Sequence, residues 1–325
     1  MVKDYETNVL KAFNFKNIKG KIPELKLLDC SIRTISFETP IDSSNMQAHH
    51  WVNIVDIIEK NYDRIDGFVV LTGTDTMSYT ASAISFMLEN LNKPVIFTGS
   101  QLPIGDLRTD AKENLITAIQ MAASRDNDLP KVTEVGLYFE YKLYRANRTT
   151  KVSSEQFDAF SSPNYPSLGE SGVYLNFNHK AMKKVDQKKK LIVRRNIEAN
   201  VVILKLFPGI SEVVVSSILS IPGLKGVILE TFGAGNAPDS KWFIDLLKEA
   251  IKRNIPIVNV TQCIGGSVLL GHYETSTQLK KIGIIDGKDI TTESAIAKLK
   301  YLIGENISSD NFRTIFETPL RGEMS

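Results

Sequence analysis

The segment from Phe68 to Leu91 has the clearest hydrophobic pattern in the chain. It opens with an apolar run at 68–71 that is short, rich in β-forming residues and without alternation, which predicts a buried parallel strand. A polar turn at 72–76 follows. Apolar residues then recur on one face of a predicted helix: Met77, Ala81, Ile84, Leu88 and Leu91. The turn therefore lies at the carboxyl end of a strand, where open α/β sheets bind ligands and a helix N-terminus favours negative charge.

Short apolar runs and helical periodicity alternate along most of the chain. The expected strands lie at 25–37, 68–71, 94–98, 132–139, 201–207, 225–231 and 255–262. The expected helices lie around Trp51 to Tyr62 and at 77–91, 110–123, 211–220, 240–253, 275–282, 292–303 and 309–317. Strands that alternate with helices in this way predict an α/β fold with parallel sheets. Residues 141–172 show little periodicity, as is typical of functional or disordered connections.

A lysine-rich run between Lys180 and Arg195 interrupts this alternation. It could form a basic docking patch, but a solvated linker between domains is the favoured interpretation. A chain of 325 residues is long enough for two cores. We therefore expect a domain at 1–182, a linker at 183–200 and a second domain at 201–325.

Composition excludes several classes of function. The 39 basic and 37 acidic residues nearly balance, at a net charge of +2, so no nucleic-acid partner is expected. The two cysteines, Cys30 and Cys263, favour free thiols in a reducing compartment. No apolar run approaches the roughly 20 residues of a membrane helix, and the first residues lack the form of a signal peptide. These features predict a cytoplasmic protein that does not bind membranes.

The turn at 72–76 contains candidate catalytic residues. The Thr74 hydroxyl needs a base before it can act as a nucleophile, and a lysine amine can be that base when desolvation or a neighbouring cation lowers its pKa. Lys151 is the candidate because it lies in a polar loop, and Asp75 could hold that lysine or accept a substrate ammonium group. The alternative is that Thr74 and Asp75 only cap the following helix. Taken alone, Ser43 and Ser44 read as ordinary loop residues.

Phosphate and metal sites have weaker support. No glycine-rich phosphate-binding motif follows the 68–71 strand, and Gly233-Ala234-Gly235 lacks a third glycine. The four histidines do not have the spacing of metal ligands. We therefore expect neither a cofactor nor a metal ion.

An ordered set of motifs identifies a family resemblance. The segments DSSNM, TGTDT, VIFTGSQ, YRANRTTK, FGAGNAP and VNVTQC occur in that order from about Ile41 onward. Together they closely resemble the type I (cytoplasmic) L-asparaginases of the bacterial asparaginase/glutaminase family. The resemblance implies a larger, flavodoxin/Rossmann-like N-terminal catalytic domain, a smaller parallel α/β C-terminal domain, and homodimers or dimers of dimers.

The resemblance also implies an activity. The expected reaction is hydrolysis of L-asparagine to L-aspartate and ammonia through a threonine acyl-enzyme. By position, Ser43 would contact the substrate α-carboxylate, with Ser44 beside it, and Asp75 would bind the α-amino group. Thr74, Asp75 and Lys151 would form the activating set, and backbone N–H groups near the turn would form the oxyanion hole. A non-catalytic amino-acid sensor on the same fold is the alternative. A component of a tRNA-dependent amidotransferase is disfavoured because the chain shows no RNA-facing domain.

One family segment has no counterpart here. Members open with a buried strand that leads into T-G-G-T-I-G, whose threonine is the primary nucleophile in the family. Residues 1–325 contain no such segment. The natural protein could begin earlier, with Met1 internal, or the chain could be a shortened form. In either case we expect impaired turnover as numbered, and loss of a central strand would cost several kcal/mol of a total stability of about 5–15 kcal/mol.

Overall fold

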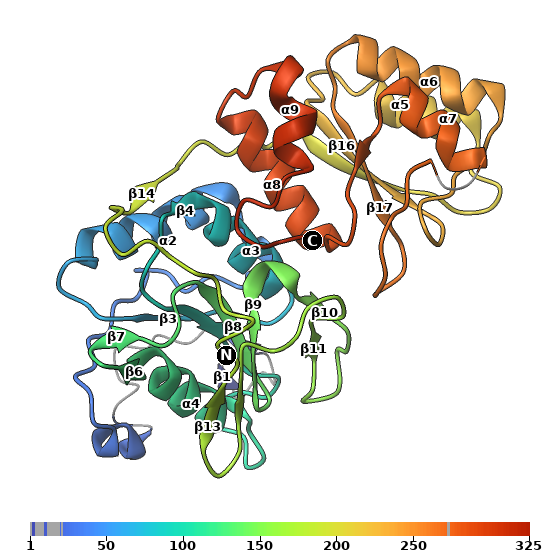
Figure 1. Ribbon diagram of the computed structural model, residues 1–325. Helices are drawn as coiled ribbons and strands as arrows, with labels where there is room; N and C mark the ends of the chain where they lie inside the picture. Colours follow the sequence, from blue (N-terminus) through green and yellow to red (C-terminus); the bar gives the residue numbers. More distant parts are fainter. Residues whose placement is uncertain (1, 4–9, 12–19, 21, 272–273) are drawn as a thin grey trace. The chain divides into compact units, whose positions relative to one another are not determined.

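The protein folds into two compact units of unequal size. The structure, a computed structural model, describes residues 2–3, 10–11, 20, 22–271 and 274–325. The first unit comprises residues 1–193 and the second 194–325. Both combine helices with a sheet (Figure 1), which confirms the predicted α/β class with a larger N-terminal domain.

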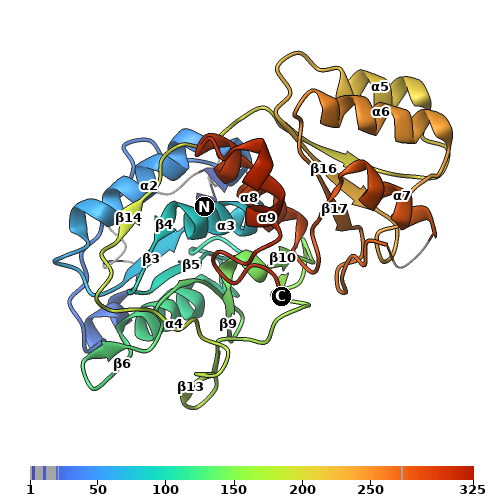
Figure 2. The same cartoon turned by 45° about the horizontal axis from the view of Figure 1, so that its top comes forward.

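The first unit is organised around a six-stranded mixed sheet in the order β13-β12-β9-β8-β5-β3. Its parallel strands are β3 (Phe68–Leu71), β5 (Val95–Thr98) and β8 (Val135–Phe139). The antiparallel strands β9 (Lys142–Arg145), β12 (Gly169–Ser171) and β13 (Leu175–Phe177) extend it. Helices α2 (Ala48–Asn61) and α3 (Met77–Met87) cover one face and α4 (Ala111–Ala123) the other (Figures 1 and 2).

Shorter elements complete this unit. They are β1 (Val2–Lys3), β2 (Leu10–Lys11), β4 (Leu88–Glu89), β6 (Arg125–Asp126), β7 (Leu129–Pro130), β10 (Thr150–Lys151), β11 (Phe160–Ser161), β14 (Ile192–Val193), and the 3₁₀ helices η2 (Pro23–Leu27), η3 (Ser43–Asn45) and η4 (Ala146–Arg148). Within the expected 183–200 linker, β14 pairs with β4. The aperiodic 141–172 segment contains the short strands β9, β10, β11 and β12, which its sequence pattern did not predict.

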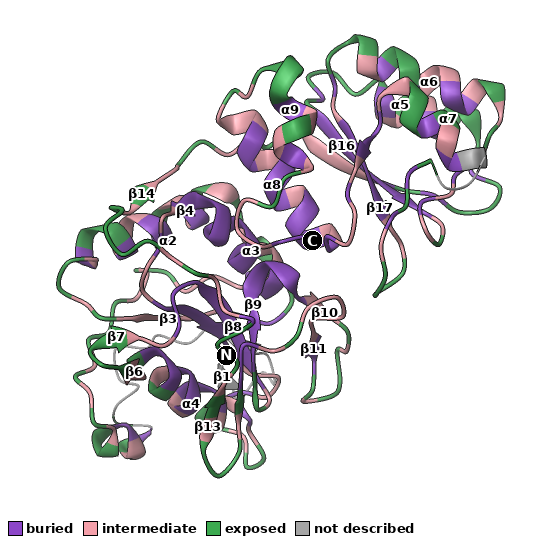
Figure 3. Ribbon diagram, in the orientation of Figure 1, coloured by how far each residue is buried: buried purple, intermediate pink, exposed green. Residues whose placement is uncertain are grey.

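The core of the first unit lies on both faces of β5 and β8. All residues of these two strands are buried, and so are Met77, Ala81 and Ile84 on the predicted face of α3 (Figure 3). On the opposite face, Ala118 and Met121 of α4 pack in one cluster with Ile96 and Tyr138. The helical periodicity of the sequence correctly identified which faces are covered.

Two expectations for the start of the sheet were wrong. Residues 25–37 do not form a strand: η2 occupies Pro23–Leu27, and 31–37 is irregular. In addition, all four residues of β3 are half-buried rather than buried, because β3 is the edge strand among the described residues. An apolar segment becomes a strand only when a neighbouring edge supplies hydrogen-bond partners, and local sequence cannot specify that neighbour.

The second unit follows the predicted alternation closely. Its four parallel strands lie in sequential order: β15 (Val201–Lys205), β16 (Gly226–Thr231), β17 (Ile257–Thr261) and β18 (Ile285–Asp286). The helices are α5 (Glu212–Leu219), α6 (Lys241–Lys252), α7 (Glu274–Ile282), α8 (Thr292–Gly304) and α9 (Ser309–Phe316). Apolar residues of α5, α6 and α7 form one core with the sheet, whereas α8 packs against β15, β16 and β17.

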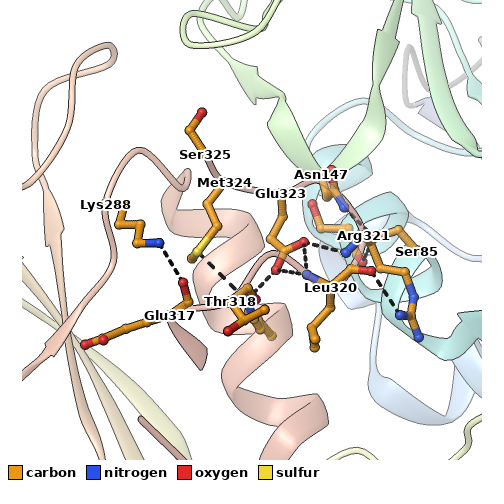
Figure 4. Close-up of polar contacts among 12 residues, drawn as sticks. Ser85, Asn147, Lys288, Glu317, Thr318, Leu320, Arg321, Glu323, Met324 and Ser325 are labelled. Atoms are coloured by element: carbon orange, nitrogen blue, oxygen red, sulfur yellow. Dashed lines mark hydrogen bonds and ion pairs between the residues drawn. The ribbon is translucent and has the colours of Figure 1, made fainter. Parts of the chain in front are cut away.

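A buried ion pair ties the last residues of the second unit to α8. Lys298 and Glu323 have fully buried side chains and contact each other directly. The Glu323 carboxylate also accepts hydrogen bonds from the backbone N–H groups of Leu320 and Arg321 (Figure 4). The charges of both side chains are thus matched by partners, as burial of ions requires.

Two further sequence expectations concern cysteines and membranes. Both Cys30 and Cys263 are free thiols, as predicted. Across the described residues, none of the helices combines the length and apolar character needed to span a bilayer.

Candidate active site

The site is formed where β3 ends and α3 begins. The T-G-T-D-T turn joins these elements, and the N-cap of α3 is Thr76, whose side chain makes no capping hydrogen bond. The Thr76 hydroxyl instead donates to the Ser43 carbonyl oxygen at 2.7 Å. The side chains of Thr74 and Asp75 turn toward Lys151, so the capping interpretation does not account for their contacts.

Thr74, Asp75 and Lys151 form one hydrogen-bonded cluster. Lys151 Nζ donates to Thr74 Oγ1 at 2.8 Å and to Asp75 Oδ1 at 2.7 Å. Thr74 is buried, the Lys151 side chain is 18% exposed and the Asp75 side chain is 67% exposed. The hydroxyl and the amine are therefore shielded from solvent, whereas the carboxylate faces it and is accessible to a small polar ligand.

Lys151 reaches the turn because the chain before it is anchored on α3. Lys151 lies in β10, directly after a buried segment that contains η4. Asn147 Nδ2 donates to Ser85 Oγ at 3.1 Å, and the Thr149 hydroxyl contacts Ser78 Oγ at 3.0 Å. These two contacts hold residues 147–149 along α3, from near its end to its first turn. Lys151, 77 residues after Thr74 in sequence, thereby reaches the turn that precedes the same helix.

Ser43 lies against the turn, and Ser44 does not. A Cβ atom at Gly73 would lie 2.4 Å from Ser43 Oγ, so only glycine fits beside the buried Ser43 side chain. The backbone N–H and hydroxyl of Ser44 both contact Asp42 Oδ1, at 3.0 and 2.8 Å. These hydrogen bonds, the backbone one first, lower the pKa of the Asp42 carboxyl. Ser44 therefore stabilises its own turn.

Gln101 belongs to the cluster and was not singled out from the sequence. Thr74 Oγ1 donates to Gln101 Oε1 at 3.0 Å, and Gln101 Nε2 donates to the Gln156 carbonyl oxygen at 3.0 Å. Its position in the sequence could have indicated that it belongs to the site. Gln101 follows β5, which lies beside β3 in the sheet, and the carboxyl ends of parallel neighbours meet at one edge.

This arrangement is suited to proton transfer at a hydroxyl group. A hydroxyl in contact with an amine, which is itself held by a carboxylate, is the general pattern of an activated nucleophile or of an activated water molecule. Such a group could activate the nucleophile that attacks an amide carbonyl.

Comparison with known proteins identifies the family. Residues 1–183 match the family model "Asparaginase, N-terminal" and residues 200–316 match "Glutaminase/Asparaginase C-terminal domain". The chain is 42% identical over 305 residues to L-asparaginase 1 of Escherichia coli (strain K12), covering 94% of this chain and 88% of that protein. It therefore belongs to the asparaginase family of hydrolases that act on amides.

Solved structures agree with this assignment. L-asparaginase I from Vibrio cholerae superposes with a TM-score of 0.81 at 42% identity, covering 90% of this chain and 86% of that one. The thermostable L-asparaginase from Thermococcus kodakarensis gives a TM-score of 0.89 at 30% identity, covering 100% and 95%. The family resemblance predicted from the sequence motifs is thus confirmed as that of a bacterial type I asparaginase.

Proposed function

We propose that this protein hydrolyses L-asparagine to L-aspartate and ammonia. The observation that carries the proposal is the contact of Lys151 Nζ with both Thr74 Oγ1 and Asp75 Oδ1, at 2.8 and 2.7 Å. The names of the relatives from Escherichia coli and Vibrio cholerae, both L-asparaginases, supply the substrate class.

The site residues divide into binding and proton-transfer roles. Asp75 is exposed enough to accept the substrate α-ammonium group. Ser43, which lies against the turn, contacts the α-carboxylate, and Ser44 assists through the short 3₁₀ helix that it shares with Ser43. In the transfer step, the amine of Lys151 takes the proton of the Thr74 hydroxyl or of a water molecule held there. Backbone N–H groups at the start of α3 stabilise the oxyanion that forms on the amide carbonyl.

The reaction proceeds through a threonine acyl-enzyme. A threonine oxygen attacks the side-chain carbonyl carbon of asparagine, the hydroxyl proton passes to the amide nitrogen, and the C–N bond breaks to release ammonia. Water, deprotonated at the Thr74–Lys151 pair, then cleaves the ester to release aspartate. In the family pattern the first nucleophile belongs to T-G-G-T-I-G, a segment that residues 1–325 do not contain, so the acyl-enzyme proposal is tested with that segment present.

We propose that the edge of β3 is where the strand leading into T-G-G-T-I-G would pair, as the family pattern implies. Among the described residues β3 ends the sheet, and its four apolar side chains are only half-buried. A parallel strand added along this edge would cover them. It would also end beside Thr74, at the carboxyl edge where a T-G-G-T-I-G threonine could reach the substrate.

The test is ammonia release from L-asparagine by purified chain 1–325, beside the same chain extended by an apolar strand and T-G-G-T-I-G. The extended protein should hydrolyse asparagine, and the short chain should reach at most a small fraction of that rate. Equal rates would refute the need for the added threonine. No hydrolysis by either protein would refute the asparaginase assignment.

Calorimetric titration of chain 1–325 with asparagine separates the hydrolase from an amino-acid sensor. The sensor requires binding by the short chain and no hydrolysis by the extended one. We further propose a homodimer or dimer of dimers in the cytoplasm, as the family resemblance implies. Light scattering of the purified protein tests the assembly, and a monomeric mass at micromolar concentration would contradict it.

A further inference from the structure

Asp110 is the N-cap residue of α4, but its side chain does not cap this helix. Aspartate at an N-cap commonly accepts hydrogen bonds from the first helical N–H groups and stabilises the helix by about 1 kcal/mol. The Asp110 side chain makes no such bond. Thr109 Oγ1 accepts from the Ala111 N–H group instead, at 3.0 Å. The carboxylate of Asp110 is thereby available for another partner.

That partner is the loop after β5. Asp110 Oδ2 accepts from the backbone N–H of Gln101 at 2.9 Å, and Oδ1 accepts from that of Leu102 at 3.0 Å. Asn114 Nδ2 donates to Asp110 Oδ2 and to the Gly99 carbonyl oxygen, both at 3.1 Å. Asp110 and Asn114 are buried, at 7% and 0% exposure, so these charge-assisted hydrogen bonds fix the loop backbone on a rigid helix.

The fixed loop determines where the Gln101 amide points. Its Nε2 is committed to the Gln156 carbonyl oxygen, so its Oε1 faces Thr74. A threonine hydroxyl has one proton. Lys151 Nζ donates to Thr74 Oγ1, so in this resting arrangement the Thr74 proton points to Gln101 Oε1. Transfer of that proton to the Lys151 amine requires rotation about the Thr74 Cβ–Oγ1 bond. Gln101 therefore fixes the position of the Thr74 oxygen from which the reaction starts.

We propose that Asp110 is a positioning residue for this hydroxyl: by holding the backbone of residues 101 and 102, it keeps Gln101 against Thr74. This proposal rests on the proposed function of Thr74, and it concerns a residue that acts on Thr74 through Gln101 without contacting the substrate. Displacement of a reacting group by about 1 Å from a remote substitution can cost on the order of 100-fold in rate. Asp110 should therefore influence turnover although it lies outside the Thr74–Asp75–Lys151 cluster.

The first experiment measures steady-state kinetics of the T-G-G-T-I-G-extended protein and of its Asp110→Asn variant. Asparagine has nearly the volume of aspartate but presents one acceptor oxygen and a donor to two backbone N–H groups. We expect kcat to fall roughly 10- to 100-fold with KM changed much less, because substrate binding groups are untouched. An unchanged kcat would overturn the proposal.

A double-mutant cycle tests whether Asp110 acts through Gln101. The variant Gln101→Met keeps the side-chain length and removes the acceptor for the Thr74 hydroxyl. If the inference holds, the double variant D110N/Q101M loses little more kcat than the more impaired single variant. Multiplicative losses would show that Asp110 acts by another route and would overturn the proposal.

Two further measurements separate positioning from general destabilisation. The control Thr291→Ala removes the N-cap contact with the Ser294 N–H group at the start of α8, and it should lower Tm without changing kcat. A crystal structure of Asp110→Asn should show that Gln101 Oε1 has left Thr74. If the extended parent shows no hydrolysis, the asparaginase proposal fails, but the crystal structure of Asp110→Asn still decides the positioning inference. A retained Gln101–Thr74 contact in that structure would overturn the positioning inference.

Discussion

Replacing Glu323 with glutamine should destabilise the second unit strongly. The Glu323 carboxylate is fully buried and receives hydrogen bonds from Lys298 Nζ and from the backbone N–H groups of Leu320 and Arg321. Every one of these partners is a donor. Glutamine offers one acceptor oxygen and turns its own NH₂ donors toward at least one of them. It also leaves the ammonium of Lys298 buried without its counter-charge.

The size of the effect follows from the burial of the pair. Breaking a buried ion pair by removing one partner costs about 3–5 kcal/mol, because the remaining charge is uncompensated. Domains have total stabilities of about 5–15 kcal/mol, so this loss removes a large share of the free energy of unfolding. The double variant K298M/E323M removes both charges and should be more stable than E323Q. In this variant the Thr318 carbonyl oxygen loses its hydrogen bond from Lys298 Nζ, at 2.7 Å, and the N–H groups of Leu320 and Arg321 lose their acceptor, so the recovery should be partial.

Tryptophan fluorescence during urea unfolding measures this loss in the second unit alone. The chain has two tryptophans, Trp51 in α2 and Trp242 in α6. In a Trp51→Phe background Trp242 is the only reporter, and the parent and both variants are compared in that background by linear extrapolation. A change of less than about 1 kcal/mol for E323Q, or a double variant no more stable than E323Q, would refute the reasoning about the buried charge.

Three other predictions follow from the same structure. Gly73→Ala should destabilise the first unit by about 1–3 kcal/mol, because the new methyl group would meet Ser43 Oγ at 2.4 Å, and a second substitution Ser43→Gly should restore the urea midpoint. Burial alone would raise the pKa of Glu323, but the Lys298 ammonium lowers this pKa overall. The ion pair therefore stabilises the fold fully at pH values above the ordinary carboxyl pKa of 4.5, and its contribution decreases as the pH falls below that value. Between neutral pH and about pH 3, the urea midpoint should fall more in the parent than in E323Q. In the extended enzyme Lys151→Met should reduce kcat by about 10²- to 10⁴-fold, whereas the exposed control Lys142→Met should leave it unchanged; equal rates for the two variants would remove Lys151 from the mechanism.

The parts of the fold that the sequence predicted are those determined by local periodicity. Helices such as α3 and α8 place apolar residues on one face over three or more turns, and they lie within a few residues of the expected bounds. Short strands such as β4 and β14 exist because each pairs with a segment far away in the sequence, and two residues carry too little pattern to reveal that partner. Residues 25–37 were expected to form a strand because of their apolar pattern, but no strand of the sheet pairs with them. Without a hydrogen-bonding partner, the apolar pattern alone does not produce a strand.

The candidate site shows the same division between local and distant information. Thr74 and Asp75 could be proposed from the sequence because they occupy a turn between a strand and a helix, where the fold class places ligands. Their connection to Lys151, 76 or 77 residues later, rested on the place of Lys151 in a polar loop and then on the family resemblance, because no local rule supplies it. Asp110 is the sharper case, because a local rule assigns aspartate at that position to its own helix. Its carboxylate binds the loop after β5 instead. A residue that departs from its locally favoured contact in order to fix a loop beside a reactive hydroxyl is the kind of exception expected where function competes with local stability.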